Sequence, residues 1–179
     1  ARLKKSIPVL RSLRHPSNLG YGAALRSGCN TATKEFVFYT DGDGQYDVAD
    51  LPLLVGRMRN DVDVVNGIKQ KRVDPWHRVL LGTIYARAMR RLFRLPVEDV
   101  DCDFRLMRAR VLGNIHLKSN GGAICVELVK RLERAGARFS EIGVHHRKRQ
   151  FGHSQFYTIQ NIMRLTRELW ALWREFFVP

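Results

Sequence analysis

The chain has 179 residues, 45% of them hydrophobic, which suits a single globular domain with a sizeable core. Its 31 Lys and Arg residues outnumber 17 Asp and Glu residues, so the formal net charge is +14. Such a field favours polyanionic partners, namely nucleic acid, anionic lipid headgroups or phosphorylated substrates. Cys29, Cys102 and Cys125 are far apart and include no CxxC pair, which argues against a disulfide scaffold and against a zinc site. No apolar run approaches the length of a membrane span.

The first part of the chain predicts a strand followed by a helix. Residues 7–13 have the composition of a strand, and Asn18, Gly20 and Gly22 predict a turn that opens a helix ending near Thr33. The amino end of that helix either offers N–H groups to a phosphate or polar ligand, or packs closely against the sheet.

A buried strand followed by acidic residues is the central feature. Residues 36–39 are aromatic or β-branched and predict a short buried strand. Asp41, Asp43 and Gln45 follow directly and alternate with glycines, at the strand end where open α/β sheets bind ligands. Closely spaced carboxylates repel each other, and their hard oxygen atoms suit Mg2+ or Mn2+. The alternative is a solvated Asp-Gly hairpin turn.

The middle of the chain alternates helix, strand and helix. Residues 48–59 predict an amphipathic helix, residues 62–68 a buried strand, and residues 75–92 a long helix that begins at a proline. Arginines before and along this long helix either bind phosphate or form a solvated basic face.

A second acidic segment precedes the next strand. Asp99, Asp101 and Asp103 alternate, which would place them on one side of an extended segment. We take Asp101 as a candidate for acceptor positioning or base chemistry. The alternative is an Asp that caps a turn or pairs with Arg105.

The last third predicts a helix, a strand and a second helix. Residues 124–135 form the first helix, with Glu127 near its start, where a carboxylate either faces the site or stabilises the helix dipole. Residues 138–147 predict a strand that ends in a His pair, for which a structural or phosphate-contact role is favoured over zinc. Residues 156–178 predict a basic amphipathic helix, which either lies in a membrane interface or docks on its own domain or a partner subunit.

Four short motifs occur in one chain and in one order: NxGxGxA from Asn18, DxDxQ from Asp41, DCDFR from Asp101 and GxSQF from residue 152. Together they resemble family 2 glycosyltransferases over about residues 8–178, in particular the polyprenyl-phosphate (dolichyl-phosphate mannosyltransferase-like) branch. The resemblance implies a GT-A-like α/β fold, a Rossmann-like nucleotide-diphospho-sugar transferase with a mixed sheet, flanking helices and a C-terminal amphipathic helix. It divides the chain into a catalytic domain at 1–154 and a membrane-associated helix at 155–179. Family members begin with a further βαβ unit, so we expect an amino-terminally truncated domain.

The implied activity is the metal-dependent, inverting transfer of a sugar from a nucleotide-diphosphate sugar to a polyprenyl (undecaprenyl or dolichyl) phosphate, with Mg2+ or Mn2+ as cofactor. We expect a peripheral protein at the cytoplasmic, inner face of the membrane, able to form a homo-oligomer and without a nucleic-acid partner.

Two alternatives stay open. A nucleic-acid-binding module is suggested by charge alone and requires basic residues interleaved with exposed aromatic residues on one face. An inactive membrane-associated fragment follows if the missing unit is essential.

The resemblance also assigns roles to single residues. The implied roles are catalysis by Asp43, Asp101 and Arg78; nucleotide-sugar binding by Asn18, Gly20, Gly22 and Asp41; acceptor or phosphate binding by Arg72, Arg78, Arg105, Arg147, His153 and Ser154; and metal binding by Asp41, Asp43 and Gln45. The chain departs from the family pattern at Asp103, where many members have Gly, and at His153, which replaces a cation and carries little charge at neutral pH.

Overall fold

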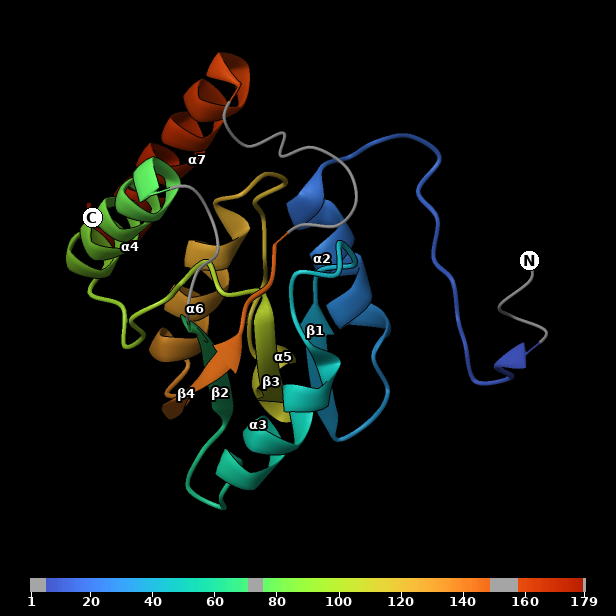
Figure 1. Ribbon diagram of the computed structural model, residues 1–179. Helices are drawn as coiled ribbons and strands as arrows, with labels where there is room; N and C mark the ends of the chain where they lie inside the picture. The colour runs from blue at the N-terminus through green and yellow to red at the C-terminus, as the bar shows by residue number, and fades with distance from the viewer. Residues whose placement is uncertain (1–5, 71–75, 149–157, 179) are drawn as a thin grey trace.

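Figure 1 shows the computed structural model of the chain, which describes residues 6–70, 76–148 and 158–178. In chain order its elements are α2 (Tyr21–Thr31), β1 (Phe36–Thr40), the short 3-10 helix η1 (Val48–Asp50), α3 (Leu51–Arg57), β2 (Val64–Gln70), α4 (Trp76–Phe93), β3 (Phe104–Arg108), α5 (Ala109–Leu112), α6 (Ile124–Arg134), β4 (Phe139–His145) and α7 (Ile159–Phe177). The expected class, a mixed α/β sheet with flanking helices, is confirmed.

The strands pair in the order β1-β3-β2-β4. β3 is antiparallel to β1 and to β2, whereas β2 and β4 are parallel. The carboxyl ends of β1, β2 and β4 therefore lie at the same edge of the sheet as the amino end of β3. We call this edge the carboxyl edge. The loop that follows β1 and the loop that precedes β3 meet there.

Helices cover both faces of the sheet (Figure 1). On one face, Leu54 of α3 packs against Phe104 and Leu106 of β3. On the other face, Leu128 of α6 packs in a cluster with Met107 of β3. Because side chains alternate along a strand, β3 contributes to both clusters and is buried on both faces. Hydrophobic burial therefore fixes β3 as a central strand.

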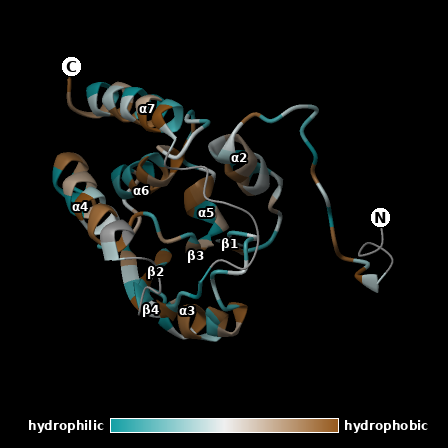
Figure 2. Ribbon diagram, turned by 45° about the horizontal axis from the view of Figure 1, so that its top comes forward, coloured by the Kyte–Doolittle hydropathy of each residue, from teal (hydrophilic) through white to brown (hydrophobic). Residues whose placement is uncertain are grey.

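Helix α6 is the central helix of the second face. Leu128 and Leu132 belong to the cluster against the sheet, whereas Val126 and Val129 belong to a separate cluster with residues of α4 and α7. Figure 2, coloured by hydropathy, shows α6 close to both of these outer helices. The apolar residues of α6 are thus buried on two sides, against the sheet and against the outer helices, while its charged residues include Glu133 and Arg134 near its end.

The carboxyl-terminal half of α7 docks on the domain. Leu172 and Phe176 are buried in the cluster that α6 and α4 share, and the ring centroid of Phe177 lies 6.3 Å from that of Phe93 of α4. Docking on its own domain is thus confirmed for this half, whereas Ile159 and Met163 of the first half are exposed. None of the helices within the described ranges is both long and apolar enough to cross a membrane.

The expectation of a strand at residues 7–13 is wrong. These residues form no strand, and their apolar members, Ile7, Val9, Leu10 and Leu13, are exposed. Figure 1 shows this segment running apart from the sheet before it enters α2. A strand needs a neighbouring strand to satisfy its N–H and C=O groups, and in the described residues none pairs with this segment. Its apolar composition alone is not sufficient.

The docking of α7 leads to a stability prediction. Replacing Phe176, which is buried, with Ala should lower the free energy of unfolding by about 3 kcal/mol, because a cavity forms against α6. Replacing Ile159 with Ala, on the exposed part of the same helix, should change it by no more than about 0.5 kcal/mol. Urea unfolding measures both values, and equal losses would show that α7 is not anchored through Phe176.

Candidate functional site

The DxDxQ loop lies at the carboxyl edge, directly after β1. The side chains of Asp41, Asp43 and Gln45 are half-buried, whereas Gly42 and Gly44 are exposed. Asp43 Oδ1 accepts a hydrogen bond from the Gln45 N–H at 3.0 Å, and Gly44 has a φ of +76°, a conformation that favours glycine. The segment is therefore a turn, but it is not a hairpin, because β1 pairs with β3 and not with the next strand.

Gln45 connects this loop to the end of β4. Its side-chain Nε2 donates to the carbonyl oxygen of Arg147 at 3.3 Å, and the Arg147 N–H donates back to the Gln45 carbonyl oxygen at 2.7 Å. The guanidinium of Arg147 is exposed and donates to Asp47 of the same loop. The structure thus brings Arg147, an expected phosphate contact, beside the expected metal loop.

The acidic segment before β3 is a turn, so its alternating acids do not lie on one side of an extended run. The Cys102 N–H donates to the carbonyl oxygen of Asp99 at 3.2 Å, which reverses the chain. Asp99 is buried and its carboxylate binds Lys69 Nζ of β2 at 3.1 Å. Asp101 and Asp103 remain half-buried at the carboxyl edge. The pairing of Asp99 with Lys69 separates Asp99 from the other two.

Two tyrosines that the sequence reasoning missed join the acidic loops. The backbone N–H of Asp103 donates to the Tyr46 hydroxyl at 3.1 Å, and the Tyr39 hydroxyl donates to Asp103 Oδ1 at 3.4 Å. Tyr46 also stacks on Phe104, with ring centroids 5.6 Å apart. Both positions were visible in the sequence, since Tyr39 lies in the predicted strand and Tyr46 follows Gln45. The order of the strands that makes them meet Asp103 was not.

The electrostatics place negative charge between the loops. Burial raises the pKa of the Cys125 thiol, and the charges of Asp103 and Asp101 raise it further. Tyr21 keeps 37% of its surface exposed, yet partial burial of its ring, followed by the charges of neighbours that include Asp103 and Asp41, raises its pKa. Asp41 of one loop and Asp103 of the other therefore both raise the pKa of Tyr21, after the larger effect of burial.

The donor atoms of the two loops are carboxylate and amide oxygens, which fit a hard divalent cation. Within the described ranges, no three His, Cys, Asp or Glu side chains converge as a metal site. The metal ligands expected from the sequence are of another composition, namely two Asp side chains and the amide oxygen of Gln45. The remaining ligands in such sites are water and substrate phosphate.

The amino end of α2 is packed against the loop at residues 119–121. The Gly22 N–H donates to the Asn120 carbonyl oxygen at 2.8 Å, and a Cβ on Gly22 would lie 2.5 Å from the Ser119 carbonyl oxygen. Asn18 Oδ1 accepts the N–H of Gly20, whose φ of +97° favours glycine. The glycines are therefore explained by close packing, although against a loop and not against the sheet.

Arg105 requires a correction. Its side chain is 0% exposed, with Nε donating to Asn66 Oδ1 at 2.8 Å and Nη2 donating to the Val100 carbonyl oxygen at 3.1 Å. A guanidinium in this position has no surface for an acceptor phosphate, and it does not pair with Asp101 in the contacts observed. Arg72, His153, Ser154 and the side chain of Arg78 lie outside the described residues.

Glu127 lies in the first turn of α6, the position expected of a helix-dipole partner, and it also holds a neighbouring loop. It is fully buried and accepts hydrogen bonds from the backbone N–H groups of Lys118 and Ser119 at 2.9 and 2.7 Å, and from Arg131 Nε at 2.7 Å. The carboxylate holds the loop on which the amino end of α2 rests. Its part in the site is thus indirect.

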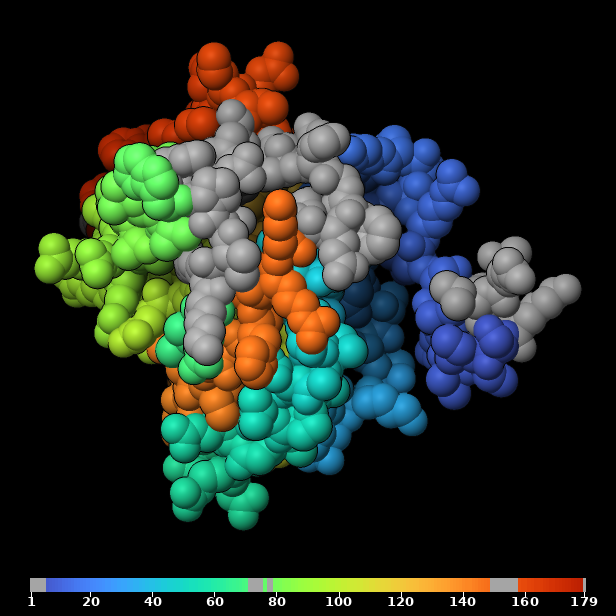
Figure 3. All heavy atoms as spheres, in the orientation of Figure 1, coloured from blue at the N-terminus to red at the C-terminus, as the bar shows by residue number. Residues whose placement is uncertain are grey.

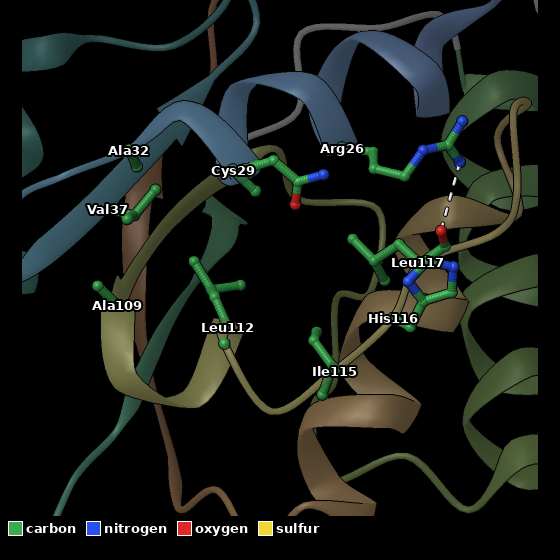
Figure 4. Close-up of a pocket in the computed structure, with 11 residues that line it drawn as sticks. Arg26, Cys29, Ala32, Val37, Ala109, Leu112, Ile115, His116 and Leu117 are labelled. Carbon is green, nitrogen blue, oxygen red and sulfur yellow. Dashed lines mark hydrogen bonds between the residues drawn. The ribbon is translucent and has the colours of Figure 1, made fainter.

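A cavity of about 290 Å³ lies away from the carboxyl edge, between α2, β1 and α5. Figure 4 shows Cys29, Val37, Leu112 and Ile115 around it, with Arg26 donating to the Leu117 carbonyl oxygen. Val37 is near the amino end of β1, and the lining contains none of the expected site residues. The cavity is therefore separate from the candidate site.

Comparison with known proteins identifies the relatives of this chain. Residues 1–115 match the profile of Glycosyl transferase family 2. An uncharacterized glycosyltransferase of Mycobacterium bovis and one of Mycobacterium tuberculosis are each 30% identical over 139 residues, which is 76% of this chain and 63% of theirs. The chain thus spans less than two thirds of the length of these relatives.

Solved structures share the fold. Glucosyl-3-phosphoglycerate synthase from Mycobacterium tuberculosis, in complex with Mn2+, UDP-glucose and glycerol 3-phosphate, is 16% identical with a TM-score of 0.59, over 96% of this chain and 58% of that one. The same enzyme with Mg2+ and UDP is 14% identical with a TM-score of 0.62, over 94% and 58%. At these identities the likeness concerns the fold, and it agrees with the expected GT-A-like class.

The packing of α2 predicts different effects for two glycines of one helix. Gly22→Ala should destabilise the protein by about 1–3 kcal/mol, because its Cβ meets two backbone carbonyl oxygens that cannot easily move. Gly28→Ala, whose Cβ meets nothing within 4 Å, should be neutral or stabilise by up to about 1 kcal/mol. Thermal unfolding of both variants tests this, and a tolerated Gly22→Ala would contradict the packing described.

Proposed function

The chain belongs to glycosyl transferase family 2, and from that premise we propose that it transfers a sugar from a nucleotide-diphosphate sugar to a polyprenyl phosphate, with inversion at the anomeric carbon. The observation that carries the proposal is the meeting of two acidic loops at the carboxyl edge. The loop after β1 supplies Asp41 and Asp43, and the loop before β3 supplies Asp101 and Asp103. Family membership gives the reaction class, and the arrangement of the two loops supports the carboxyl edge as the place of the reaction.

On the donor side, Asp41, Asp43 and Gln45 would hold Mg2+ or Mn2+. The bound metal supplies charge neutralisation for the leaving nucleoside diphosphate. The chain's own residues orient the loop: the Asp43 carboxylate accepts the Gln45 N–H, and Gln45 binds the backbone of Arg147. Asn18, Gly20 and Gly22 shape the amino end of α2, which packs on the loop at residues 119–121, and the charge of Asp41 contributes to the raised pKa of Tyr21 in that helix. In this proposal the nucleotide lies between α2 and the DxDxQ loop.

On the acceptor side, an oxygen of the lipid phosphate attacks the anomeric carbon while the bond from that carbon to the nucleotide diphosphate breaks. The diphosphate leaves with the electron pair, so direct displacement inverts the centre. A phosphate monoester is already anionic near neutral pH, and no strong general base is needed. Asp101 positions the acceptor, and Arg147 supplies positive charge at the same edge. The proposal retains Arg72, Arg78, His153 and Ser154 as further phosphate contacts.

An exposed apolar surface favours a lipid acceptor. It combines large apolar side chains from α4 and from α7, namely Trp76, Leu80, Leu81, Ile84, Ile159, Ile162, Met163 and Trp170. We call this set the docking face. Exposed arginines accompany it on the same helices, namely Arg87, Arg91, Arg167 and Arg174. Apolar and cationic side chains together suit a surface of anionic lipid.

The order of the elements supports a docking face on the side of the candidate site. β2 leads into α4, and β4 leads into α7, so both helices follow strands that end at the carboxyl edge. Figure 3 shows the surfaces of α4, in green, and α7, in red, on the same side of the molecule. In this proposal the protein works peripherally at the inner face of a membrane, with its lipid substrate reaching the site from that side.

A small phosphorylated acceptor is the second candidate. The related solved enzyme is described with glycerol 3-phosphate and with phosphoglyceric acid. A direct comparison of undecaprenyl phosphate with 3-phosphoglycerate as acceptor, with the same donor, separates the two. Transfer to 3-phosphoglycerate alone would exclude the lipid proposal.

Metal-dependent nucleotide binding tests the donor side. Mn2+ should strengthen the binding of UDP or GDP to the unaltered chain, measured by calorimetry. In Asp43→Asn, nucleotide binding in the presence of Mn2+ should be about tenfold weaker or more. Even residues that only hydrogen-bond to a metal ligand contribute about tenfold to metal affinity. Asp61→Asn changes an exposed carboxylate in the turn before β2, at the opposite edge, and should bind as the unaltered chain does. Tight DNA binding without any metal response would instead favour the nucleic-acid module.

Vesicle binding tests the docking face. The chain should bind vesicles of anionic phosphatidylglycerol more tightly than neutral phosphatidylcholine, and salt should weaken the binding. Leu80→Glu combined with Ile159→Glu should lower the bound fraction by about tenfold, because apolar area is lost and like charges are added. The matched control combines Leu53→Glu with Val55→Glu, which change two exposed apolar residues of α3 on the other face of the sheet. Equal losses in both proteins would refute the docking face.

A further inference from the structure

Four side chains form a continuous row across the sheet, directly beneath the carboxyl edge. The strand register places Tyr39 beside Arg105, Arg105 beside Asn66, and Asn66 beside Glu141. The Arg105 guanidinium lies 5.7 Å from the Tyr39 ring centroid, and its Nε donates to Asn66 Oδ1 at 2.8 Å. Asn66 Nδ2 donates to Glu141 Oε1 at 3.0 Å. We call these four residues the polar row.

The interior of the protein does not require a polar row at this depth. Two residues further from the carboxyl edge, the same register aligns Val37, Met107, Val64 and Phe139, all apolar. Burying polar groups costs free energy unless every group is paired. Within the described residues Arg105 Nη1 has no hydrogen-bond partner, so the row is not fully compensated. A need other than stability is therefore the better explanation of its composition.

Each member of the row also holds a different residue of the loop at residues 98–103. The four contacts are Glu141 Oε2 with the Glu98 N–H at 2.9 Å, Asn66 Nδ2 with the Asp99 carbonyl oxygen at 3.0 Å, Arg105 Nη2 with the Val100 carbonyl oxygen at 3.1 Å, and the Tyr39 hydroxyl with Asp103 Oδ1 at 3.4 Å. The loop thus rests on the row at both of its ends and on two successive carbonyl groups between them.

From this geometry we propose that the polar row positions the loop at residues 98–103, and with it Asp101 and Asp103, for the transfer step. Glu141, Asn66, Arg105 and Tyr39 are then positioning residues that touch no substrate. The inference rests on the proposed function, because it assigns the loop to the acceptor side. It gives Arg105 a role that its buried position allows, in place of phosphate contact.

The test compares two carboxylates that hold backbone N–H groups beside the sheet, the half-buried Glu141 of β4 and the buried Asp63, which precedes β2. Glu141→Gln removes the charge that accepts the Glu98 N–H, whereas Asp63→Asn removes a charge at the opposite edge. Asp63 likewise accepts a backbone N–H, that of Arg138 at 3.0 Å, and binds Arg110 Nη2 at 2.7 Å. Glu141→Gln should lower kcat about tenfold or more while the KM for the donor changes less than about twofold. Asp63→Asn should lower stability and leave kcat unchanged.

Hydrogen exchange measures the mobility of the loop at residues 98–103 without a measurement of activity. In Glu141→Gln, amide exchange should become faster in residues 98–103 and stay unchanged in α6. Exchange that is faster throughout the chain, or a kcat loss equal to that of Asp63→Asn, would overturn the inference. If the unaltered chain transfers no sugar to any acceptor, the proposed function fails, and the exchange pattern still decides whether the row holds the loop. Tyr39→Phe, which removes only the hydroxyl bound to Asp103, provides the same comparison if Glu141→Gln does not fold.

Discussion

The candidate site depends on the direction of one short strand. β3 lies antiparallel between β1 and β2, which brings its amino end, and the acids before it, to the carboxyl ends of the other strands. A parallel β3 would place those acids at the opposite edge, beside Asp63. Burial on both faces fixes the strand, since Phe104 and Leu106 pack toward α3 and Met107 packs toward α6. A slip by one residue would turn Arg105 into the apolar cluster against α3, so register is fixed as well as direction.

The local elements could be predicted from the sequence, but their pairing could not. Apolar runs predicted β1 and β2, alternation predicted β4, and the DxDxQ motif was placed correctly at the end of β1, because all of these are local patterns. Residues 7–13 have a similar composition and form no strand, since composition says nothing about an available neighbouring edge. The sequence left open whether residues 98–103 are extended or form a turn, for a related reason. Asp99 of this turn pairs with Lys69, which is far away in the sequence, and no local pattern shows that ion pair.

Arg105 shows how residue type and position can point in different directions. An arginine beside an acidic motif suggests phosphate binding, because arginine binds phosphate well. The residues on either side of it, Phe104 and Leu106, suggest a strand buried on at least one face, and the structure shows burial on both. What distinguishes Arg105 from a surface arginine is its neighbours across the sheet, Tyr39 and Asn66. These are known only from the register. The sequence therefore shows that an arginine is present, with its capacity to bind anions, but it does not show that the side chain is buried.

The two sides of the proposed site share one anchoring loop, although they come from distant parts of the chain. The loop at residues 118–121 accepts the Gly22 N–H and carries the backbone groups that Arg26 binds, so it fixes the amino end of α2. The same loop donates to Glu127, whose partner Arg131 binds Glu175 of α7 at 2.8 Å. Helix α7 also carries part of the docking face. Helices α2 and α7 are therefore connected through the loop at residues 118–121, Glu127 and Arg131, in addition to the apolar contacts that hold α7 on the domain.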